Sequence, residues 1–421
     1  MRRDKNLKEY YLGIVPDGYE ENPYYEDRVA LDKLIASYLH FSTDVENTLT
    51  LVKTGTVADV NLEYCFDIEN PEWITLDTST DVSIDLSAGS TVFFRGNNET
   101  FNESWTGNVA QETNYYHFNS TNPIKCAGNI MSILGTESVP NYAFHSLFKG
   151  FSNLKSAPDL PATDTGTYCY LRMFHTSGIT KAPKINSSII MDYGCYQIFF
   201  QSSITSTPGL VCTEIKQYGL KDGFAQCLQL KNAPNMDSVE IIGNYGCSYM
   251  CQQYDHPSKL TIATSFNNLQ SVGNYGMECF YGGCEKLKKA TAPLKAETVG
   301  RNGWDEVFNG CDSLIEGPEY IQAETVGIQA CLQICGYTKI KKAPVIKIPT
   351  LSSECFKWAW IYNPQIEYVR IESDTNGSNA TREWFAGTIH QGGVIEHKES
   401  FSISKNSTWG IPSGWDEKII E

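Results

Sequence analysis

The stretch Leu154-Lys155-Ser156-Ala157-Pro158 decides the fold, because it returns along the chain in a fixed register. It recurs as Ile179-Thr180-Lys181-Ala182-Pro183 and then six more times in less strict form. The last positions of the eight copies are residues 158, 183, 208, 234, 264, 291, 318 and 344. A unit of 25 to 30 residues cannot bury its apolar face alone. The repeat therefore predicts a solenoid in which neighbouring units stack.

A second signature precedes each copy and predicts the rest of the unit. The segment 168–174 aligns with 193–199, and the pair Tyr-Gly returns at residues 218, 245 and 275. Apolar residues here have mixed three- and four-residue spacing, which suits a short helix or turn. The stretch that ends in Ala-Pro suits a short strand, because proline stops it. We therefore expect an α/β repeat with a parallel ladder.

The composition excludes several classes of protein. The chain has 421 residues, of which 41% are hydrophobic and 19% charged, and this balance fits a globular protein. A net charge of −16 argues against nucleic-acid binding. No apolar run approaches the roughly 18 residues that span a bilayer, so we expect no membrane insertion. Fourteen cysteines are too few for a disulfide scaffold, which needs roughly 8–10% of the residues.

The first residues favour assembly inside the cell. A basic start is followed by an apolar stretch, Tyr10–Val15, that is too short for the core of a signal peptide. We therefore expect the chain to remain in the cytoplasm of the cell that makes it, or to be assembled there. Disulfides are rare in that compartment, so we expect reduced cysteines.

The repeat resembles that of a known family. The unit Phe308-Asn309-Gly310-Cys311-Asp312-Ser313-Leu314-Ile315-Glu316-Gly317-Pro318 resembles the BspA-like leucine-rich repeat. Residues 88–97 resemble the β module that precedes such repeats, and residues 409–415 resemble their closing motif. The resemblance covers roughly residues 55–415. It implies an α/β leucine-rich-repeat solenoid, of the kind found in surface adhesins of gut Bacteroidales and in virions of phages that infect them.

The resemblance and the patterning divide the chain into four parts. We expect an N-terminal anchor at 1–50, a β-sandwich-like module at 51–130, a solenoid of about eight repeats at 131–371 and a C-terminal cap at 372–421. An amphipathic helix is expected over residues 26–39. Its apolar face and the neighbouring tyrosines are the expected assembly contacts, since tyrosine is enriched at interfaces. These residues are Tyr24, Tyr25, Leu31, Leu34, Ile35 and Tyr38. The alternative is that this segment merely caps the β module.

The search for catalytic or metal-binding residues finds little. Cys247 and Cys251, like Cys331 and Cys335, have the spacing of metal ligands, but they align with interior apolar positions of other repeats. No HExxH, Walker or G-x-S-x-G motif occurs. We therefore expect no catalytic site, no metal and no cofactor.

One surface pattern could bind a ligand. Lysines follow the Leu or Ile of several repeats: Lys155, Lys181, Lys231, Lys288, Lys289, Lys341 and Lys342. Stacking would align them into a cationic stripe for an acidic glycan or an acidic subunit; the other interpretation is a solvated face that discourages edge pairing. Flat aromatic rings also stack on sugars, and Tyr254 and Trp304 are candidates.

Two classes of function remain. The first is a non-enzymatic virion protein, either a head or tail fibre or a capsid decoration, that displays its repeats to a host surface, glycan or mucus. Its N-terminal segment would bind capsid, portal or tail proteins, and we expect a homo-oligomer, a trimer in a fibre. The second is a bacterial cell-surface adhesin that binds a host or matrix protein, which should carry an export signal.

Overall fold

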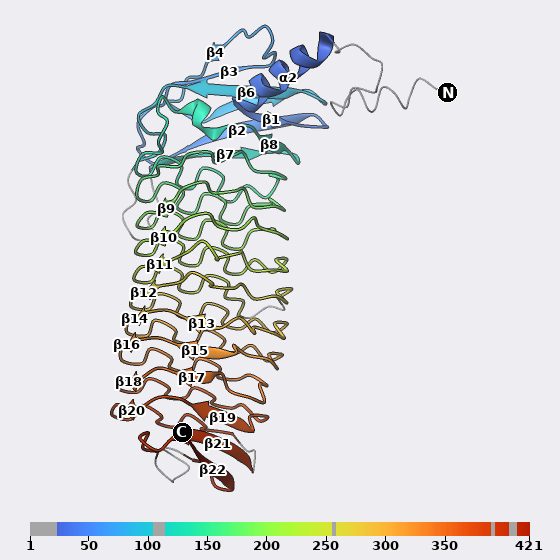
Figure 1. Cartoon of the computed structure of the whole chain (residues 1–421). Coiled ribbons are helices and arrows are strands. Elements are labelled where there is room, and N and C mark those ends of the chain that lie inside the picture. The colour runs from blue at the N-terminus through green and yellow to red at the C-terminus, as the bar shows by residue number, and fades with distance from the viewer. Residues whose placement is uncertain (1–22, 104–113, 255–257, 389–391, 404–410) are drawn as a thin grey trace.

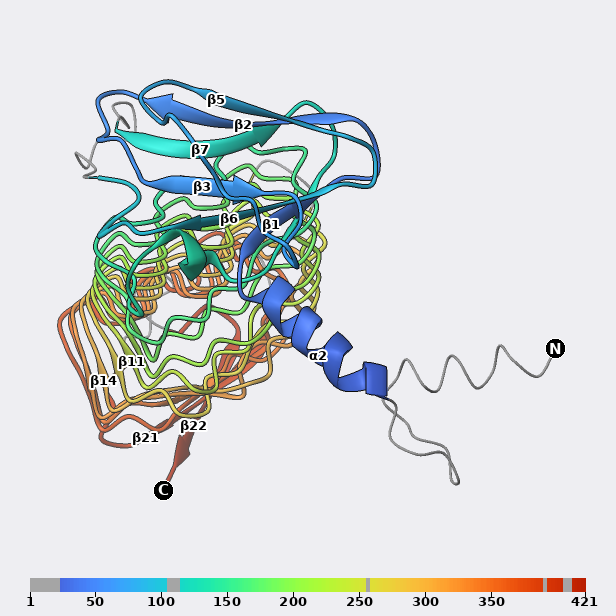
Figure 2. The same ribbon diagram turned by 90° about the horizontal axis from the view of Figure 1, so that it is seen from above.

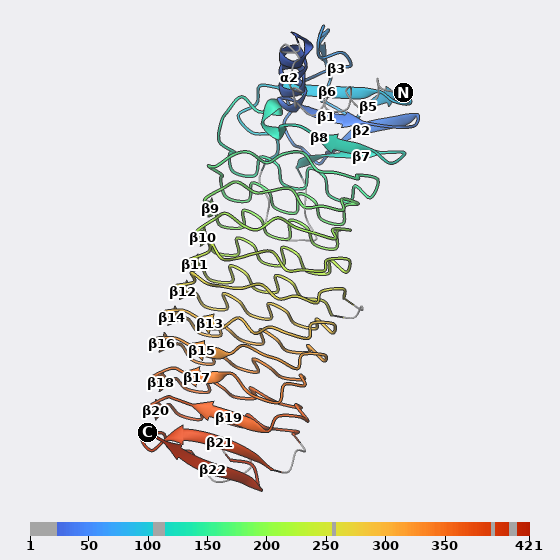
Figure 3. The ribbon, with the colours of Figure 1, turned by 45° about the vertical axis from the view of Figure 1, so that its right-hand side comes forward.

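A computed structural model describes residues 23–103, 114–254, 258–388, 392–403 and 411–421. A β module lies at one end, and a parallel β-solenoid of about nine turns extends from it (Figure 1). Helix α2 (Pro23–Ala36) lies beside the module, whereas the last strand, β22 (Trp415–Ile420), lies at the opposite end (Figure 3). The molecule is therefore a rod whose two ends differ in structure.

The N-terminal module is built from two antiparallel sheets, as the alternating pattern predicts. The first sheet has the order β4-β3-β6-β1-β8 and the second β5-β2-β7. The strands are β1 (Leu39–Ser42), β2 (Asn47–Thr54), β3 (Leu62–Cys65), β4 (Ile74–Thr75), β5 (Val82–Leu86), β6 (Thr91–Gly96), β7 (Tyr115–Ser120) and β8 (Lys125–Ala127). A short 3-10 helix, η2 (Ile130–Ile133), leads into the solenoid.

The first two strands change the expected boundary at residue 50. β1 pairs with both β6 and β8, and β2 pairs with both β5 and β7. Each is thus an inner strand of its sheet, although β1 and the first half of β2 fall within the segment 1–50. The β module begins at Leu39, because a sheet cannot lose its inner strands and keep its ladder.

The solenoid strands are short and parallel and form two long ladders. One ladder has the order β16-β14-β12-β11-β10-β9 and the other β13-β15-β17-β19-β21-β22. The first contains β9 (Ile189–Ile190), β10 (Glu214–Ile215), β11 (Ile241–Ile242), β12 (Ser271–Val272), β14 (Thr298–Val299) and β16 (Thr325–Val326). β18 (Thr350–Leu351) and β20 (Thr375–Asn376) form a further pair. The second contains β13 (Leu294–Lys295), β15 (Tyr320–Gln322), β17 (Val345–Lys347), β19 (Tyr368–Ile371), β21 (Gly393–Lys398) and β22.

The third side of each turn is a ribbon of tight turns. In the first such ribbon, the N–H groups of Tyr142, Phe144 and Ser146 donate to carbonyls of the next solenoid turn. The N–H groups of the intervening residues donate locally, to the carbonyl three residues earlier. One set of alternate residues therefore joins neighbouring solenoid turns, and the other set closes local turns. The backbone N–H groups of this ribbon are thus all hydrogen-bonded.

Every fourth residue of the ribbon adopts the left-handed conformation. Tyr168, Arg172 and Thr176 have φ of 58°, 52° and 55°, and the pattern recurs along the solenoid. Tyr168 and Thr176 are partly exposed, whereas Arg172 is only 6% exposed. The residues two positions after the first two, Tyr170 and Phe174, are buried in the core. The ribbon thus has a period of four residues, unlike the 3.6 of a helix or the 2 of a strand.

This ribbon corrects the expected α/β fold class. We expected the apolar residues of segments such as 168–174 to form a short helix or turn, and they form turns. Within the described ranges, α2 is the only α-helix, and it lies outside the repeats. The protein is a parallel β-solenoid preceded by antiparallel sheets.

The interior is made of columns of stacked side chains. Phe148, Phe174 and Phe199 stack with ring centroids 5.2 and 5.6 Å apart. Cys335 continues the column of Phe174 and Phe199, and Cys247 lies in that of Leu220, as the alignment predicted. The Ala-Pro columns are also in register, since Lys181 bridges Ser206 and Lys342 bridges Tyr368 across adjacent turns.

One continuous hydrophobic core extends from the β module to the last strand. It contains Phe41 and Phe94 of the module, the solenoid columns and Trp415 of β22. The module docks on the first turn through Phe118, whose N–H donates to the Leu147 carbonyl at 2.9 Å. Residues beyond 371 add further turns and strands to the solenoid, so the expected boundary between solenoid and cap at 371/372 marks no break in the core.

In the middle of the solenoid, two turns approach each other closely at Gly300, where a Cβ would clash with backbone atoms. A Cβ on Gly300 would lie 2.7 Å from the Asn274 nitrogen and from the Gly273 carbonyl carbon. Gly273 and Gly327 meet the preceding turn in the same way. Gly317 differs, because a Cβ there would meet only Ile340 side-chain atoms, at 3.5 and 3.8 Å.

Figure 2, a view down the rod, shows the turns superimposed on one another.

We predict opposite effects for two glycine-to-alanine substitutions. Gly300→Ala should lower the free energy of unfolding by roughly 1–3 kcal/mol, because the methyl group forces two backbones apart. Gly317→Ala should be neutral or stabilise by roughly 0.4–1 kcal/mol, because it restricts the unfolded chain without a clash. Urea unfolding followed by fluorescence measures both. Equal destabilisation by the two substitutions would contradict the close approach at Gly300.

Candidate functional site

The seven candidate lysines lie along one corner of the solenoid, where strand and ribbon meet. All of them are exposed: Lys155, Lys181, Lys231, Lys288, Lys289, Lys341 and Lys342. They occupy two adjacent columns, the two positions that follow the repeat Leu or Ile. The structure therefore brings them to one edge of the rod.

The lysines do not form a continuous stripe. In the described registers, Lys231 is followed in the next turn by Thr261, and Lys288 by Ile315. Lys289 forms an ion pair with Glu316 at 2.6 Å, in which both side chains are about half exposed. Such surface pairs contribute roughly 0–1 kcal/mol. Interleaving with neutral and acidic residues dilutes the positive charge, so this edge is a weaker site for polyanions than the sequence suggested.

The two aromatic candidates have different positions. Trp304 is completely buried, so it is a core residue and not a ligand-binding one. Its backbone N–H donates to the Ala330 carbonyl, which places Trp304 in the same inward column as Cys247, and that alignment was the available signal. Tyr254 is half-buried, and its ring lies against Gly283, where an added Cβ would meet Tyr254 Cδ1 at 2.5 Å.

The expected assembly residues pack largely on the chain itself. Leu31, Ile35 and Tyr38 contact a small cluster on the outer face of β3 and β6, with Cys65 and Phe93 at its centre. The side chains of Tyr24 and Tyr25 fall outside the described residues, as do residues 1–22. Leu34 is 37% exposed, so among the described residues of α2 it is the large apolar side chain that remains most accessible to a partner.

The outer edge of the ribbon carries a tyrosine ladder that was not predicted from the sequence as a surface feature. Its six rings stack in succession with centroids 4.6 to 4.8 Å apart: Tyr142, Tyr168, Tyr193, Tyr218, Tyr245 and Tyr275. The recurring Tyr-Gly pairs were the available signal. The inner rings cover one another's faces and expose edges and hydroxyls, so the ladder stabilises the stack and offers few ring faces to a ligand.

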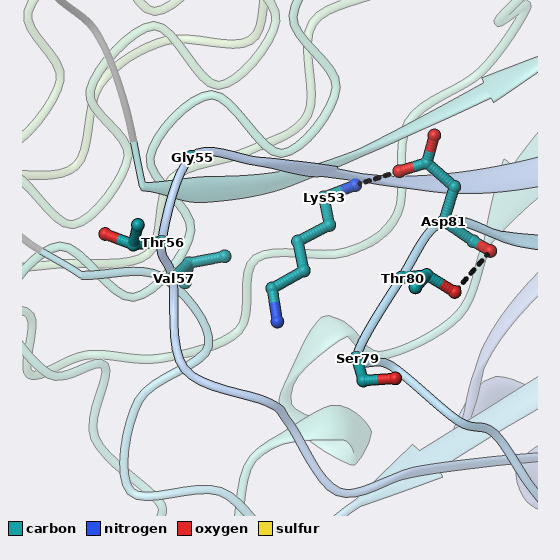
Figure 4. A pocket seen from close by; sticks show the side chains of 7 residues that line it. All are labelled: Lys53, Gly55, Thr56, Val57, Ser79, Thr80 and Asp81. Carbon is teal, nitrogen blue, oxygen red and sulfur yellow. Dashed lines mark hydrogen bonds between the residues drawn. The ribbon is translucent and has the colours of Figure 1, made fainter.

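A shallow hollow on the β module contains no catalytic arrangement among the residues that line it. Its volume is about 610 Å³, and its lining includes Lys53, Ser79 and Asp81 (Figure 4). The Lys53 side chain pairs with Asp59, which holds the pKa of the lysine above its usual value. The Ser79 hydroxyl donates to Asp77 at 2.6 Å and is not paired with a base. The polar groups of this hollow stabilise loops.

One buried carboxyl group is unusual. Asp305 is 6% exposed; its Oδ2 accepts a hydrogen bond from Asn302 Nδ2 at 2.7 Å, and its Oδ1 has no partner among the described residues. Burial raises the pKa of Asp305 to about 8. The carboxyl group is therefore mainly protonated at neutral pH, and no described base lies in hydrogen-bond contact with it.

The cysteines are structural in the described structure. All fourteen are buried and unpaired. Burial raises the pKa of Cys169, Cys212, Cys227 and Cys335 to about 12. In the described ranges no group of His, Cys, Asp or Glu could hold a metal ion, and no helix could span a membrane.

We predict that Asp305→Asn stabilises the protein increasingly as the pH rises. The native carboxyl group has a raised pKa, so wild-type stability falls between about pH 4 and pH 8, whereas the amide does not titrate. The stability gain should grow through this window and then level off. Urea unfolding at pH 4, 6, 8 and 9 measures it. A pH-independent difference would show that Asp305 is ionised in the folded state.

We predict that the native thiols resist alkylation. Iodoacetamide at pH 8 should label almost none of the fourteen cysteines until guanidinium is added, because the thiolate is the reactive form and burial disfavours it. For the same reason stability should fall as the pH rises from about 9 to 12, since the unfolded thiols then lose protons that the native thiols keep. Mass spectrometry counts the adducts. Few free thiols in the denatured chain would instead mean disulfides.

No protein-family model matches the chain, and no curated protein matches it either. The fold and the surface geometry are therefore the basis for a functional conclusion.

Proposed function

We propose that this chain is a non-enzymatic structural protein of a phage particle, a fibre or decoration, that displays its solenoid for contact with a host surface or with mucus glycans. The observation that carries the proposal is the polarity of the rod (Figure 1). One end bears the β module and α2, and about nine turns project away from them. Such a shape holds a binding surface at a distance from an attachment point.

The sequence motifs give the proposal its biological setting. The unit that ends at Pro318 resembles the BspA-like repeat, and the stacked register of these units supports a repeat solenoid. We propose that the chain is a divergent member of that group. Its extended edges, rather than a deep pocket, suit adhesion, since repeat solenoids use extended surfaces for binding.

Attachment is proposed to involve the N-terminal end. Leu34 leaves part of α2 uncovered, and Phe66 and Ile74 are 47% and 48% exposed on the same module. Apolar side chains at the attachment end would contact capsid, portal or tail proteins, and a homo-oligomer such as a trimer would bring several rods together. No nucleic acid is expected as a partner, because the chain is strongly acidic.

The proposal predicts that the full chain co-purifies with phage particles and that a chain lacking residues 1–36 does not. The truncation spares β1, which begins at Leu39, and Tyr38, which packs on Trp73 with ring centroids 5.4 Å apart. It should therefore still fold, which thermal unfolding checks. Immunogold electron microscopy of purified particles, with antibodies against the solenoid, measures incorporation.

Two results would contradict this account. Recovery of the chain in the envelope of uninfected bacteria, and not in particles, would favour a cell-surface adhesin. Normal incorporation of the truncated chain would show that attachment uses another surface. Leu34→Ala perturbs the same surface less: it should fold like the wild type, because the side chain is already 37% exposed, and it should incorporate less well than the wild type.

A further inference from the structure

A notch interrupts the outermost row of side chains on the ribbon, near the middle of the C-terminal half. This row consists of the third left-handed position of each turn, and includes Gln201, Gln226, Gly283, Gly310, Tyr337 and Tyr362. Two successive positions, Gly283 and Gly310, carry no side chain. Neighbouring turns are roughly 4.8 Å apart. The Tyr254 ring covers Gly283, where an added Cβ would meet Tyr254 Cδ1 at 2.5 Å, so the gap in the row lies at Gly310.

Aromatic rings stand on both sides of this gap. On one side, Tyr254 lies over Gly283, and its Cε1 atom is 3.7 Å from where a Cβ of Gly310 would be. On the other side, Tyr337 stacks on Tyr362 with centroids 4.9 Å apart. Tyr337 and Tyr362 are 44% and 52% exposed, and they are the described tyrosines with the greatest exposure. The stack covers one face of Tyr337 and leaves the other toward the turn of Gly310.

A chain of polar groups connects the two rings along the floor of the notch. Tyr254 Oη lies 3.5 Å from Cys279 Sγ, which donates to Glu306 Oε2 at 3.1 Å. Asn309 Nδ2 donates to the same oxygen at 3.2 Å, and Gln333 Nε2 donates to Asn309 Oδ1 at 3.0 Å. Asn309 directly precedes Gly310, and Gln333 lies four residues before Tyr337 in the next turn. An amide has two donors and two lone pairs, so both side chains keep hydrogen-bonding capacity beyond these contacts.

We propose that this notch binds a neutral hexopyranose unit of a glycan. The π face of an aromatic ring carries partial negative charge and attracts the C–H groups on the flat face of a sugar ring. The side chains of Asn309, Gln333 and Glu306 offer donors and acceptors for the hydroxyl groups at the sugar's rim. The inference rests on the proposed adhesive function and names the class of ligand and the residues that take it.

The charge of the notch selects against acidic sugars. Glu306 lies in the floor, and Glu278 interacts electrostatically with it from the neighbouring column. The candidate lysines lie instead along the corner that follows the repeat Leu or Ile. A sialic acid or uronate would bring its carboxylate next to Glu306. No described cation is in hydrogen-bond contact with Glu306, so the two negative charges would repel each other without compensation. We therefore expect neutral glycans to be preferred over their sialylated forms.

The test uses the full chain on an array of neutral and sialylated mucin-type O-glycans. Tyr337→Ala removes a ring face, and Gly310→Gln fills the notch with the residue found at the equivalent positions 201 and 226, where it adopts the same left-handed conformation. Each should weaken binding to neutral glycans at least tenfold. Tyr337→Phe keeps the ring and should retain binding. Gly150→Gln is the matched control, because Gly150 has φ of 71° in the same row and open space around it.

The outcomes separate the notch from the wider function. Tenfold losses in the first two variants, with the last two unchanged and all four equally stable in thermal unfolding, would support the notch. Neutral-glycan binding that survives in all four variants would overturn it while leaving adhesion intact. Binding that requires sialic acid and is lost in Lys341→Gln would place the site on the lysine corner instead. Incorporation into particles, measured separately, tests the proposed function whichever result is obtained.

Discussion

The structure depends on the hydrogen bonds that join each solenoid turn to the next. In the ribbon, alternate backbone N–H groups make these bonds, and the remaining N–H groups close local turns. This division is possible because every fourth residue adopts the left-handed conformation, as at Tyr168 and Arg172. Non-glycine residues rarely adopt that conformation, so the surrounding bonds must hold them there. The stack and the local geometry therefore stabilise each other.

The period of four places side chains in a way that explains most of the molecule. Positions two and six after the first left-handed residue point inward and form the columns of Phe, Cys and Trp that fill the core. Most left-handed positions are at least partly exposed and form rows along the rod, although Ser146 and Cys279 are buried. The tyrosine ladder is one such row, and the row that contains Gly310 and Tyr337 is another. The core and the candidate binding surfaces are thus two sides of the same ribbon.

The columns of the solenoid could be predicted from the sequence, because each turn repeats the same environment. The registers at Lys181 and Lys342 and the interior positions of Cys247 and Cys335 followed directly from the alignment of copies. The conformation of the ribbon could not be predicted from the sequence, because its four-residue period lies close to the 3.6 residues of a helical turn. Nothing in the local sequence distinguishes Tyr168 in a left-handed turn from a tyrosine in a helix. The strands β1 and β2, which lie on both sides of the expected boundary at residue 50, have no repeat to mark them in the sequence.

The surfaces were harder to predict than the core. The lysine stripe assumed that lysines of different copies would stack, but they occupy two columns and alternate with residues such as Thr261 and Ile315. The burial of Trp304 was predictable from its column. The notch depends on the absence of side chains at Gly283 and Gly310 between rings from other turns, and a single repeat contains no sign of it.

The central claim is that successive turns stack in register at a constant rise. Double electron–electron resonance can measure this rise on the exposed column of β9 to β16. In that column, Thr298 lies four turns from Ile189, and Thr325 lies five turns from it. Cysteines introduced there can be spin-labelled while the buried native thiols do not react. The account predicts label distances for pairs 189/298 and 189/325 near roughly 19 and 24 Å, a difference of about one strand spacing. Equal distances, or a shorter one for the second pair, would contradict the stacked solenoid.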